Sequence, residues 1–188
     1  SLLRRCRPFR NTCTNLSSSM NWLGELVCQE VRPGDTVLDL GCGNLQATGR
    51  LTECHLAVDA FRPYLDHIKS RVPTLHGELP AILGSFMDKS FDIVLLLDVL
   101  EHLRAEDHMA VIEGAERIAR ARVMVFSPDG MMKQEAFDAF GLGFNALLEH
   151  RSAVAGETFR QRGYEVSTHT TKNDAGTEAP AFLAIKNV

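Results

Sequence analysis

The sequence lacks several features that would assign it to a class at once. Its five cysteines form no Cys-x-x-Cys pair and no other spacing typical of a metal site. They therefore indicate reduced thiols in a cytosolic protein, and they predict no bound metal. No apolar run reaches the roughly 18 residues that a membrane-spanning helix needs, and no secretory apolar segment opens the chain. These absences predict a cytoplasmic protein without membrane association.

Neither sign of charge is in great excess, since the formal net charge is −4 over 188 residues. This balance disfavours a general binder of nucleic acid. The exception is the start of the chain, where arginines crowd the first ten residues: Arg4, Arg5, Arg7 and Arg10. We expect residues 1–14 to be a flexible basic segment, with a lid or a contact to an anionic substrate as the alternative. Residues 15–188 are expected to form one domain.

Apolar runs alternate with helical patterns along most of the chain. Residues 91–97 are nearly all apolar, as expected for a strand that is buried on both faces of a parallel sheet. The other expected strands are 36–40, 56–59, 74–77 and 122–126, and the expected helices are 18–30, 46–51, 63–70, 106–119 and 149–162. Two final strands, 164–171 and 181–187, can pair as an antiparallel hairpin. The pattern predicts an α/β fold, with helices on both faces of a mostly parallel sheet.

A glycine turn follows the first expected strand. Asp39 lies near the end of that strand, Gly41 and Gly43 come next at alternate positions, and Asp59 ends the second strand twenty residues after Asp39. The carboxyl ends of neighbouring parallel strands meet at one edge of a sheet, so the two carboxylates are expected to flank bare backbone. This arrangement suits a polar nucleoside ligand.

These stretches resemble the motifs of class I S-adenosylmethionine-dependent methyltransferases. Residues 37–43 look like the first motif of the family, and Asp59 falls where the family has its ribose-binding acid. Residues 77–79 resemble the segment beside the adenine, and residues 90–94 and 98–103 resemble the fourth-strand motif of members that act on small molecules. The resemblance covers about residues 20–187. It implies a Rossmann-like, doubly wound sheet of seven strands, mostly parallel with a C-terminal antiparallel hairpin.

The resemblance also implies S-adenosylmethionine as the cofactor and S-adenosylhomocysteine as its product. It places the cofactor against the glycine turn, the ends of the second and fourth strands and the adenine segment, at Asp39, Gly41, Cys42, Gly43, Asp59, Ala60, Phe61, Glu78, Leu79 and Asp98. A nucleophilic role for Cys42 is not expected. Leu45 departs from the pattern, since the family often has a third glycine at that place.

The expected methyl acceptor is an oxygen or nitrogen atom of a small molecule. No Asn-Pro-Pro-Tyr type motif follows the fourth strand, which disfavours the amino-methylating DNA and protein enzymes that use it. A hydroxyl acceptor benefits from a general base. His150 and Asp129, which follow the fifth strand, are the candidates, with a surface or packing histidine as the alternative for His150. His102 is expected to start a helix or to pack. The protein is expected to be a monomer or a homodimer.

Three other functions compete with this hypothesis. The glycine turn followed by Asp59 is also similar to a nicotinamide-dinucleotide fingerprint, but Gln46 takes the place of its third glycine. A regulatory protein that binds the cofactor without turnover is a second alternative, because fold does not establish activity. An RNA-modifying enzyme that docks through its arginine-rich start is the third, and it predicts binding that weakens steeply with salt.

Overall fold

The computed structural model describes residues 21–51, 54–138, 140–172, 176 and 178–188. The expected flexible basic segment, residues 1–14, lies outside the described residues, as does the start of the helix expected at 18–30. None of the helices among the described residues has both the length and the apolar character that crossing a membrane requires.

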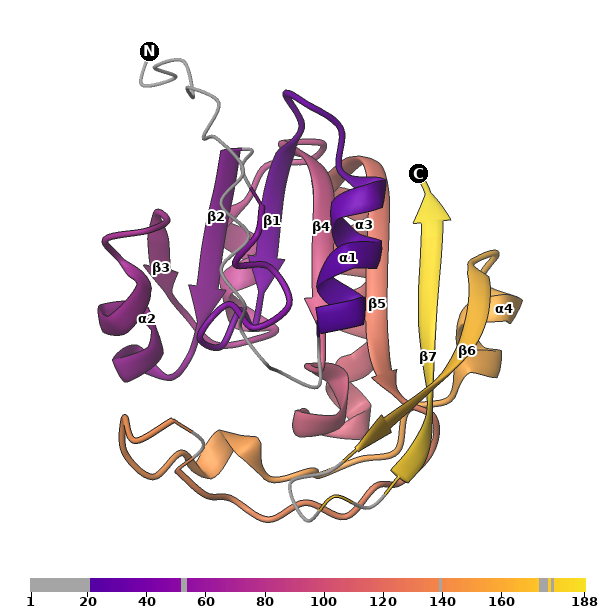
Figure 1. Ribbon diagram of the computed structural model, residues 1–188. Helices are drawn as coiled ribbons and strands as arrows, with labels where there is room; N and C mark the ends of the chain where they lie inside the picture. The colour runs from indigo at the N-terminus through magenta and orange to yellow at the C-terminus, as the bar shows by residue number, and fades with distance from the viewer. Residues whose placement is uncertain (1–20, 52–53, 139, 173–175, 177) are drawn as a thin grey trace.

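Seven strands form one sheet in the order β3-β2-β1-β4-β5-β7-β6 (Figure 1). Their bounds are β1 Thr36–Leu40, β2 Cys54–Asp59, β3 Thr74–His76, β4 Phe91–Leu97, β5 Ala119–Pro128, β6 Glu165–Lys172 and β7 Glu178–Asn187. Strands β1 to β5 pair in parallel, whereas β7 pairs antiparallel with both β5 and β6. The predicted α/β class and the seven-stranded sheet with its C-terminal antiparallel hairpin are confirmed.

Helices cover both faces of this sheet (Figure 1). The α-helices are α1 Asn21–Glu30, α2 Arg62–Ile68, α3 His108–Ile118 and α4 Gly156–Gln161, and the short 3₁₀ helices are η1 Ala81–Ser85, η2 Leu100–His102, η3 Ala105–Asp107 and η4 Ala146–Leu148. Successive residues of a strand point to opposite faces, so β1 sends Val37 toward α1 and Leu38 toward α3. The result is one apolar core on each side of the central strands.

Two of the expected helices are wrong in extent. Residues 46–50 form turns and not a helix. Leu45 adopts φ 67°, and a Cβ on Gly49 would lie 2.8 Å from the Leu45 carbonyl oxygen, so the backbone is folded back too tightly for a regular helix. The helix expected at 149–162 is confined to α4, because the backbone N–H groups of Arg151 and Ser152 instead donate to the Glu101 carbonyl.

The long connection between β5 and α4 runs past the carboxyl ends of the parallel strands (Figure 1). Two isolated antiparallel β-bridges stabilise it, one between Gly130 and Val154 and one between Phe137 and Asn145. The side chain of Asn145 caps η4 by accepting from the N–H of Leu147, at 3.0 Å. This connection therefore forms one wall of the region where an open α/β sheet binds its ligands.

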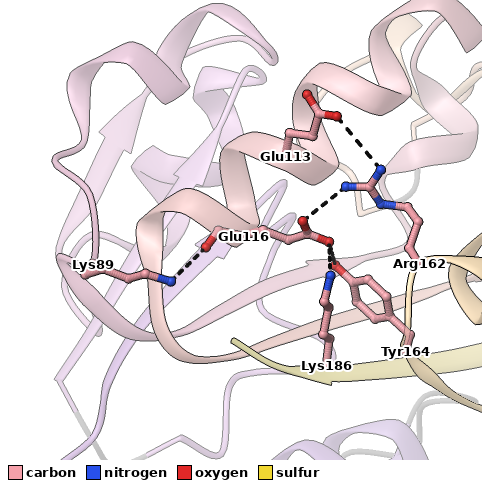
Figure 2. Close-up of polar contacts among 6 residues, drawn as sticks. All are labelled: Lys89, Glu113, Glu116, Arg162, Tyr164 and Lys186. Carbon is pink, nitrogen blue, oxygen red and sulfur yellow. Dashed lines mark hydrogen bonds and ion pairs between the residues drawn. The ribbon is translucent and has the colours of Figure 1, made fainter.

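At the opposite end of the strands, a polar network joins α3 to the antiparallel edge of the sheet (Figure 2). One carboxylate oxygen of Glu116 accepts from Lys186 and from the Tyr164 hydroxyl, both at 3.0 Å, and the other accepts from Arg162 at 3.1 Å. Lys186 belongs to β7, while Arg162 and Tyr164 lie just before β6. One half-buried carboxylate thus holds three segments together, far from the carboxyl ends of the parallel strands.

We expect Glu116→Gln to lower the free energy of unfolding by roughly 1 kcal/mol at pH 7, because charge-assisted hydrogen bonds become neutral ones and solvent screens part of the effect. Burial raises the pKa of Glu116, but the hydrogen bonds from Lys186, Tyr164 and Arg162 outweigh it, so the pKa lies below its ordinary value. The carboxylate therefore stabilises the fold above its ordinary pKa, and this contribution is lost as the pH falls through the lowered pKa.

Urea unfolding at pH 7 and at about pH 3 measures this effect, and the gap between wild type and Glu116→Gln should shrink at the lower pH. Glu113→Gln is the matched control, since the Glu113 side chain is 63% exposed and pairs with Arg162 only at 3.8 Å. A gap of unchanged size at both pH values would contradict the assignment.

Candidate functional site

Two adjoining cavities lie at the carboxyl ends of the strands. The first has a volume of about 350 Å³ and extends from the glycine turn toward the long connection, and the second has about 250 Å³ and lies over the ends of β2 and β3. Both fall in or near the size range of small-ligand sites. The residues that line both cavities are Gly41, Gly43, Tyr64, Asp98, His102 and Leu148.

The glycine turn forms the floor between the cavities. Gly41 has φ 74° and Gly43 has φ 53°, both in the left-handed region that favours glycine. The backbone N–H groups of Gly41 and Cys42 both donate to the Val58 carbonyl, at 2.8 and 3.0 Å, which ties the turn to β2. The buried Cys42 thiol has its pKa raised by burial first and by the charges of Asp39 and Asp59 next. It therefore stays protonated, in line with the expectation that it is no nucleophile.

Asp59 lines the second cavity and braces the glycine turn as well. One carboxylate oxygen accepts from the Gly43 N–H at 2.9 Å, and the other accepts from the Phe61 N–H at 2.7 Å. Burial raises the pKa of this carboxyl, whereas these backbone hydrogen bonds lower it. Each oxygen keeps further lone-pair capacity, so Asp59 can accept hydrogen bonds from a ligand while it holds the turn.

The far side of the second cavity is formed by the loop that follows β3. The exposed Glu78 and the half-buried Leu79 line it together with Ala60. Phe61 lines neither cavity among the described residues, and its ring packs edge-on against Tyr64 at a centroid distance of 4.8 Å. Tyr64, which the sequence did not single out, lines both cavities instead.

Several polar side chains line the first cavity next to the glycine turn. The buried Asp39 accepts from the Thr48 hydroxyl at 2.6 Å and lies 3.3 Å from His55 Nε2. The Asn44 Oδ1 atom is buried without a hydrogen-bond partner in the described part of the chain. Because a buried polar atom without a partner costs free energy, Asn44 is suited to a ligand that donates a hydrogen bond there.

The end of β4 brings two carboxyl groups together. Asp98 has φ 53°, a strained conformation for a residue with a side chain, and its carboxyl group interacts electrostatically with that of Glu101. Burial raises the pKa of both groups, and the charge of Asp98 raises that of Glu101 further. Glu101 also accepts from the Ser127 hydroxyl at 3.1 Å.

Two histidines stand beside these carboxyl groups. The rings of His102 and His150 lie edge to face, with centroids 4.7 Å apart. Burial and the neighbouring His150 lower the pKa of His102 to about 4, against the hydrogen bonds to the Glu149 and Leu148 carbonyls that raise it. His102 is therefore neutral at pH 7, and it lines both cavities.

Residues 38–126 match the family model described as a methyltransferase domain. This match begins in β1 and ends in β5, so it contains the glycine turn, Asp59 and the Asp98–Glu101 pair. Over these residues, just under half of the chain, the sequence is similar to methyltransferase domains. The resemblance inferred from the motifs at residues 37–43, 77–79 and 90–103 is thereby confirmed.

Solved structures of methyltransferases share this fold at low sequence identity. A SAM-dependent methyltransferase from Archaeoglobus fulgidus is 16% identical with a TM-score of 0.61, over 89% of this chain and 95% of that one. The 1,6-didemethyltoxoflavin-N1-methyltransferase of Burkholderia thailandensis is 15% identical with a TM-score of 0.62, over 90% and 78%. The magnesium protoporphyrin IX methyltransferase of Synechocystis PCC 6803 is 15% identical with a TM-score of 0.59, over 88% and 80%.

The two predicted catalytic residues of this methyltransferase lie in different places. His150 lines the first cavity and is held there by the contact of its Nδ1 atom with the Met132 carbonyl, at 2.7 Å. Asp129 is exposed and lines neither cavity, and its carboxylate accepts from the N–H of Gly156 at the start of α4, at 3.0 Å. The structure thus brings His150 to the site and shows a helix-capping contact for Asp129.

Several cavity residues of the methyltransferase were not among the predicted ones. Glu101 lies within the motif at residues 98–103, but the sequence assigned it no role. The remaining residues come from the long connection or from α2, where no local sequence pattern marks them. Those that wall the first cavity with apolar or aromatic surface are Tyr64, Met132 and Leu148. Phe137 and Phe140 wall it as well, and for these two the sequence allows either a core position or the wall of an apolar acceptor pocket. They become neighbours only through tertiary folding, so sequence spacing carries no signal for them.

Proposed function

We propose that this chain binds S-adenosylmethionine across the two cavities and transfers its methyl group to an oxygen or nitrogen atom of a small molecule. The observation that carries the proposal is that two cavities share the glycine turn. Asp59 lines one of them, Glu101 and His150 line the other, and Asp98 and His102 line both. A ligand with a ribose diol at one end and a charged amino-acid portion at the other fits this division.

The proposed contacts follow from the chemistry of the lining groups. Asp59 accepts hydrogen bonds from the ribose hydroxyls, which only a group with spare lone pairs can do. Glu78 accepts from the adenine amino group, and Leu79 covers the ring. Asp39 and the Asn44 Oδ1 atom receive the ammonium end of the ligand. Each of these groups lines the matching cavity.

The glycine turn argues against a nicotinamide dinucleotide as the ligand. Dinucleotide sites place the pyrophosphate at the N-terminus of the helix that follows the turn, where N–H groups and the helix dipole favour negative charge. Residues 41–51 form turns without a helix, and carboxylates line both cavities. A ligand with a sulfonium and an ammonium group suits this surface better than one with a pyrophosphate.

The reaction is an in-line displacement at the methyl carbon. The acceptor atom forms a bond to this carbon while the carbon–sulfur bond breaks, the bonding electrons pass to sulfur, and S-adenosylhomocysteine remains. The proton of the acceptor leaves with the help of His150. The apolar and aromatic wall of the first cavity favours a flat, partly apolar acceptor and excludes water, so that positioning lowers the barrier.

Incubation of the full chain with methyl-labelled S-adenosylmethionine tests this proposal. A panel of small phenols, hydroxylated heterocycles, amines and, as a separate class, short RNAs should give label transfer to at least one small molecule. Transfer of label to RNA alone would contradict the small-molecule acceptor and favour an RNA-modifying enzyme. Binding of the cofactor without transfer to any acceptor would favour the regulatory alternative.

His150→Ala is expected to lower turnover by about 100-fold, since groups that move a proton in the transition state contribute at least that much. The affinity for S-adenosylhomocysteine should change by less than about threefold, because His150 makes none of the contacts proposed for the cofactor. His67→Ala, a substitution of an exposed histidine on α2, is the matched control. Unaltered turnover in His150→Ala would remove the assignment.

A further inference from the structure

We propose that Glu101, His102 and His150 bind a divalent transition-metal ion, with Zn²⁺ as the probe that defines the site. Each residue offers one ligand atom to a common centre, and these atoms all lie within 4.8 Å of one another. Two imidazoles and one carboxylate form a donor set that zinc and iron(II) accept while they keep a coordination position open. Magnesium is less suited, because it prefers oxygen ligands.

The three ligands are held by backbone hydrogen bonds on two segments that meet at this point. Glu101 and His102 are consecutive in η2, where the His102 N–H donates to the Val99 carbonyl at 3.1 Å. His150 lies on the long connection, and its N–H donates to the Gln134 carbonyl at 3.1 Å. The next residue, Arg151, donates its N–H to the Glu101 carbonyl at 2.8 Å. Glu101, on η2, is thus hydrogen-bonded to Arg151, which directly follows His150 on the long connection.

Both histidines are in the orientation that metal ligands usually have. His102 Nδ1 lies 3.2 Å from the Glu149 carbonyl, and His150 Nδ1 lies 2.7 Å from the Met132 carbonyl. A carbonyl only accepts, so the Nδ1 atom must donate in each pair. In a neutral imidazole the lone pair is then on Nε2. Metal-bound histidines commonly have their other ring nitrogen fixed by such a backbone contact.

The burial of Glu101 independently supports a bound cation at this place. Its side chain is 2% exposed, and its Oε1 atom has no hydrogen-bond donor in the described part of the chain. Its surroundings include the Asp98 carboxyl group and the Ser127 hydroxyl, and no lysine or arginine of the described residues forms an ion pair with it. The buried Glu101 carboxyl group, with the half-buried Asp98 beside it, needs a positive partner, which is either a proton or a cation. Two imidazoles at this place favour a metal ion.

The consequence for the reaction rests on the proposed function. The ion would bind an acceptor hydroxyl at its open position in the first cavity and lower the pKa of that hydroxyl. The hydroxyl loses its proton to water, and its oxygen then attacks the methyl carbon while the carbon–sulfur electrons pass to sulfur. This assigns an oxygen acceptor, and it makes His150 a ligand that assists proton loss through the ion.

Metal binding is tested on the full chain after dialysis against a chelator. Calorimetric titration with Zn²⁺ should show one ion per chain, and His102→Ala, His150→Ala and Glu101→Gln should each weaken binding by at least about 10-fold, whereas His67→Ala should not. Titration with Co²⁺ should give the visible absorption of a protein-bound ion in the wild type, a readout that needs no variant to fold. Wild-type chain that binds neither ion, or that binds Zn²⁺ equally in all variants, overturns the proposal.

The same samples separate this inference from the proposed function. Binding of S-adenosylhomocysteine to the metal-free chain, together with a failure to bind Zn²⁺ or Co²⁺, overturns the metal site and leaves the methyltransferase function standing. Binding of Zn²⁺ that depends on the three ligands, without any affinity for S-adenosylhomocysteine, supports the metal site and removes the role given to it in methyl transfer.

Discussion

Asp59→Ala is expected to weaken the binding of S-adenosylhomocysteine by about 100-fold. Two charge-assisted hydrogen bonds to the ribose are lost, each worth on the order of 1.5–3 kcal/mol, and water recovers part of that. The substitution also leaves the N–H groups of Gly43 and Phe61 without their acceptor, which loosens the turn itself. We therefore expect a moderate loss of stability, of about 1–2 kcal/mol, beside the larger loss of affinity.

Calorimetric titration and thermal unfolding of the same samples measure both effects. Asp59→Asn keeps one oxygen for the turn but removes the charge, so it should recover stability more than affinity. Asp66→Ala is the matched control, because Asp66 is an exposed carboxylate on α2 that pairs with Lys69 and lines neither cavity among the described residues. A large fall in melting temperature with unchanged affinity in Asp59→Ala would show that the carboxylate serves the fold alone.

Gly41→Ala is expected to lower the free energy of unfolding by about 2–4 kcal/mol. A side chain at φ 74° is strained by about 1–2 kcal/mol. The added Cβ would also lie 2.6 Å from Val99 Cγ2 and 3.2 Å from Val99 Cγ1. Val99 is 6% exposed and branched at Cβ, so it has little freedom to move away, and overpacking of this kind costs about 1–3 kcal/mol.

Gly43→Ala provides the contrast, since it shares the backbone strain without the clash. No atom lies within 4 Å of a Cβ built on Gly43, and this residue lines both cavities. We expect a stability loss of only about 1 kcal/mol but a weakening of ligand affinity by about 10-fold, because the methyl group would occupy part of the proposed ligand site.

Urea unfolding and titration with S-adenosylhomocysteine distinguish the two glycines. Val99→Ala in the Gly41→Ala background should restore part of the lost stability, as a double-mutant cycle would reveal. If Gly41→Ala and Gly43→Ala lost the same stability, the contact with Val99 would not be the cause.

Two of the central strands, β1 and β4, could be predicted to the residue. Both faces of these strands are buried, so their sequences are mostly apolar, and the residue after each run, Gly41 or Asp98, marks the end. The neighbouring β5 is longer than expected, since it covers Ala119–Pro128 and not only 122–126. The C-terminal hairpin was less well bounded. β7 begins at Glu178, three residues before the expected start, since pairing with β6 continues beyond the apolar residues.

The glycine turn shows where local pattern misleads. Residues 46–51 have the apolar spacing of a helix, yet Leu45 just before them adopts a left-handed backbone conformation. The family pattern often has a third glycine at this position, and glycine adopts that conformation without strain. The side chain of Leu45 is buried against the small core beneath α2, with Ala57, Leu65 and Ile68. The packing of the Leu45 side chain compensates for the backbone strain. The helix propensity of a single residue does not include such packing, so the sequence pattern could not predict it.

The candidate site could be predicted in one half and not in the other. The groups of the second cavity follow from motifs, because Asp59 and Glu78 directly end strands or follow them. The first cavity combines η2 with a segment some 50 residues later, and Glu101 and His150 become neighbours only through the hydrogen bonds between these segments. No spacing rule links residues that tertiary contacts bring together.

Calorimetric titration of the full chain with S-adenosylhomocysteine and, in parallel, with NAD tests the central claim most directly. We predict saturable binding of S-adenosylhomocysteine at one site per chain, abolished or strongly weakened in Asp59→Ala, and no measurable binding of NAD. Saturable binding of NAD without any binding of S-adenosylhomocysteine would contradict the account.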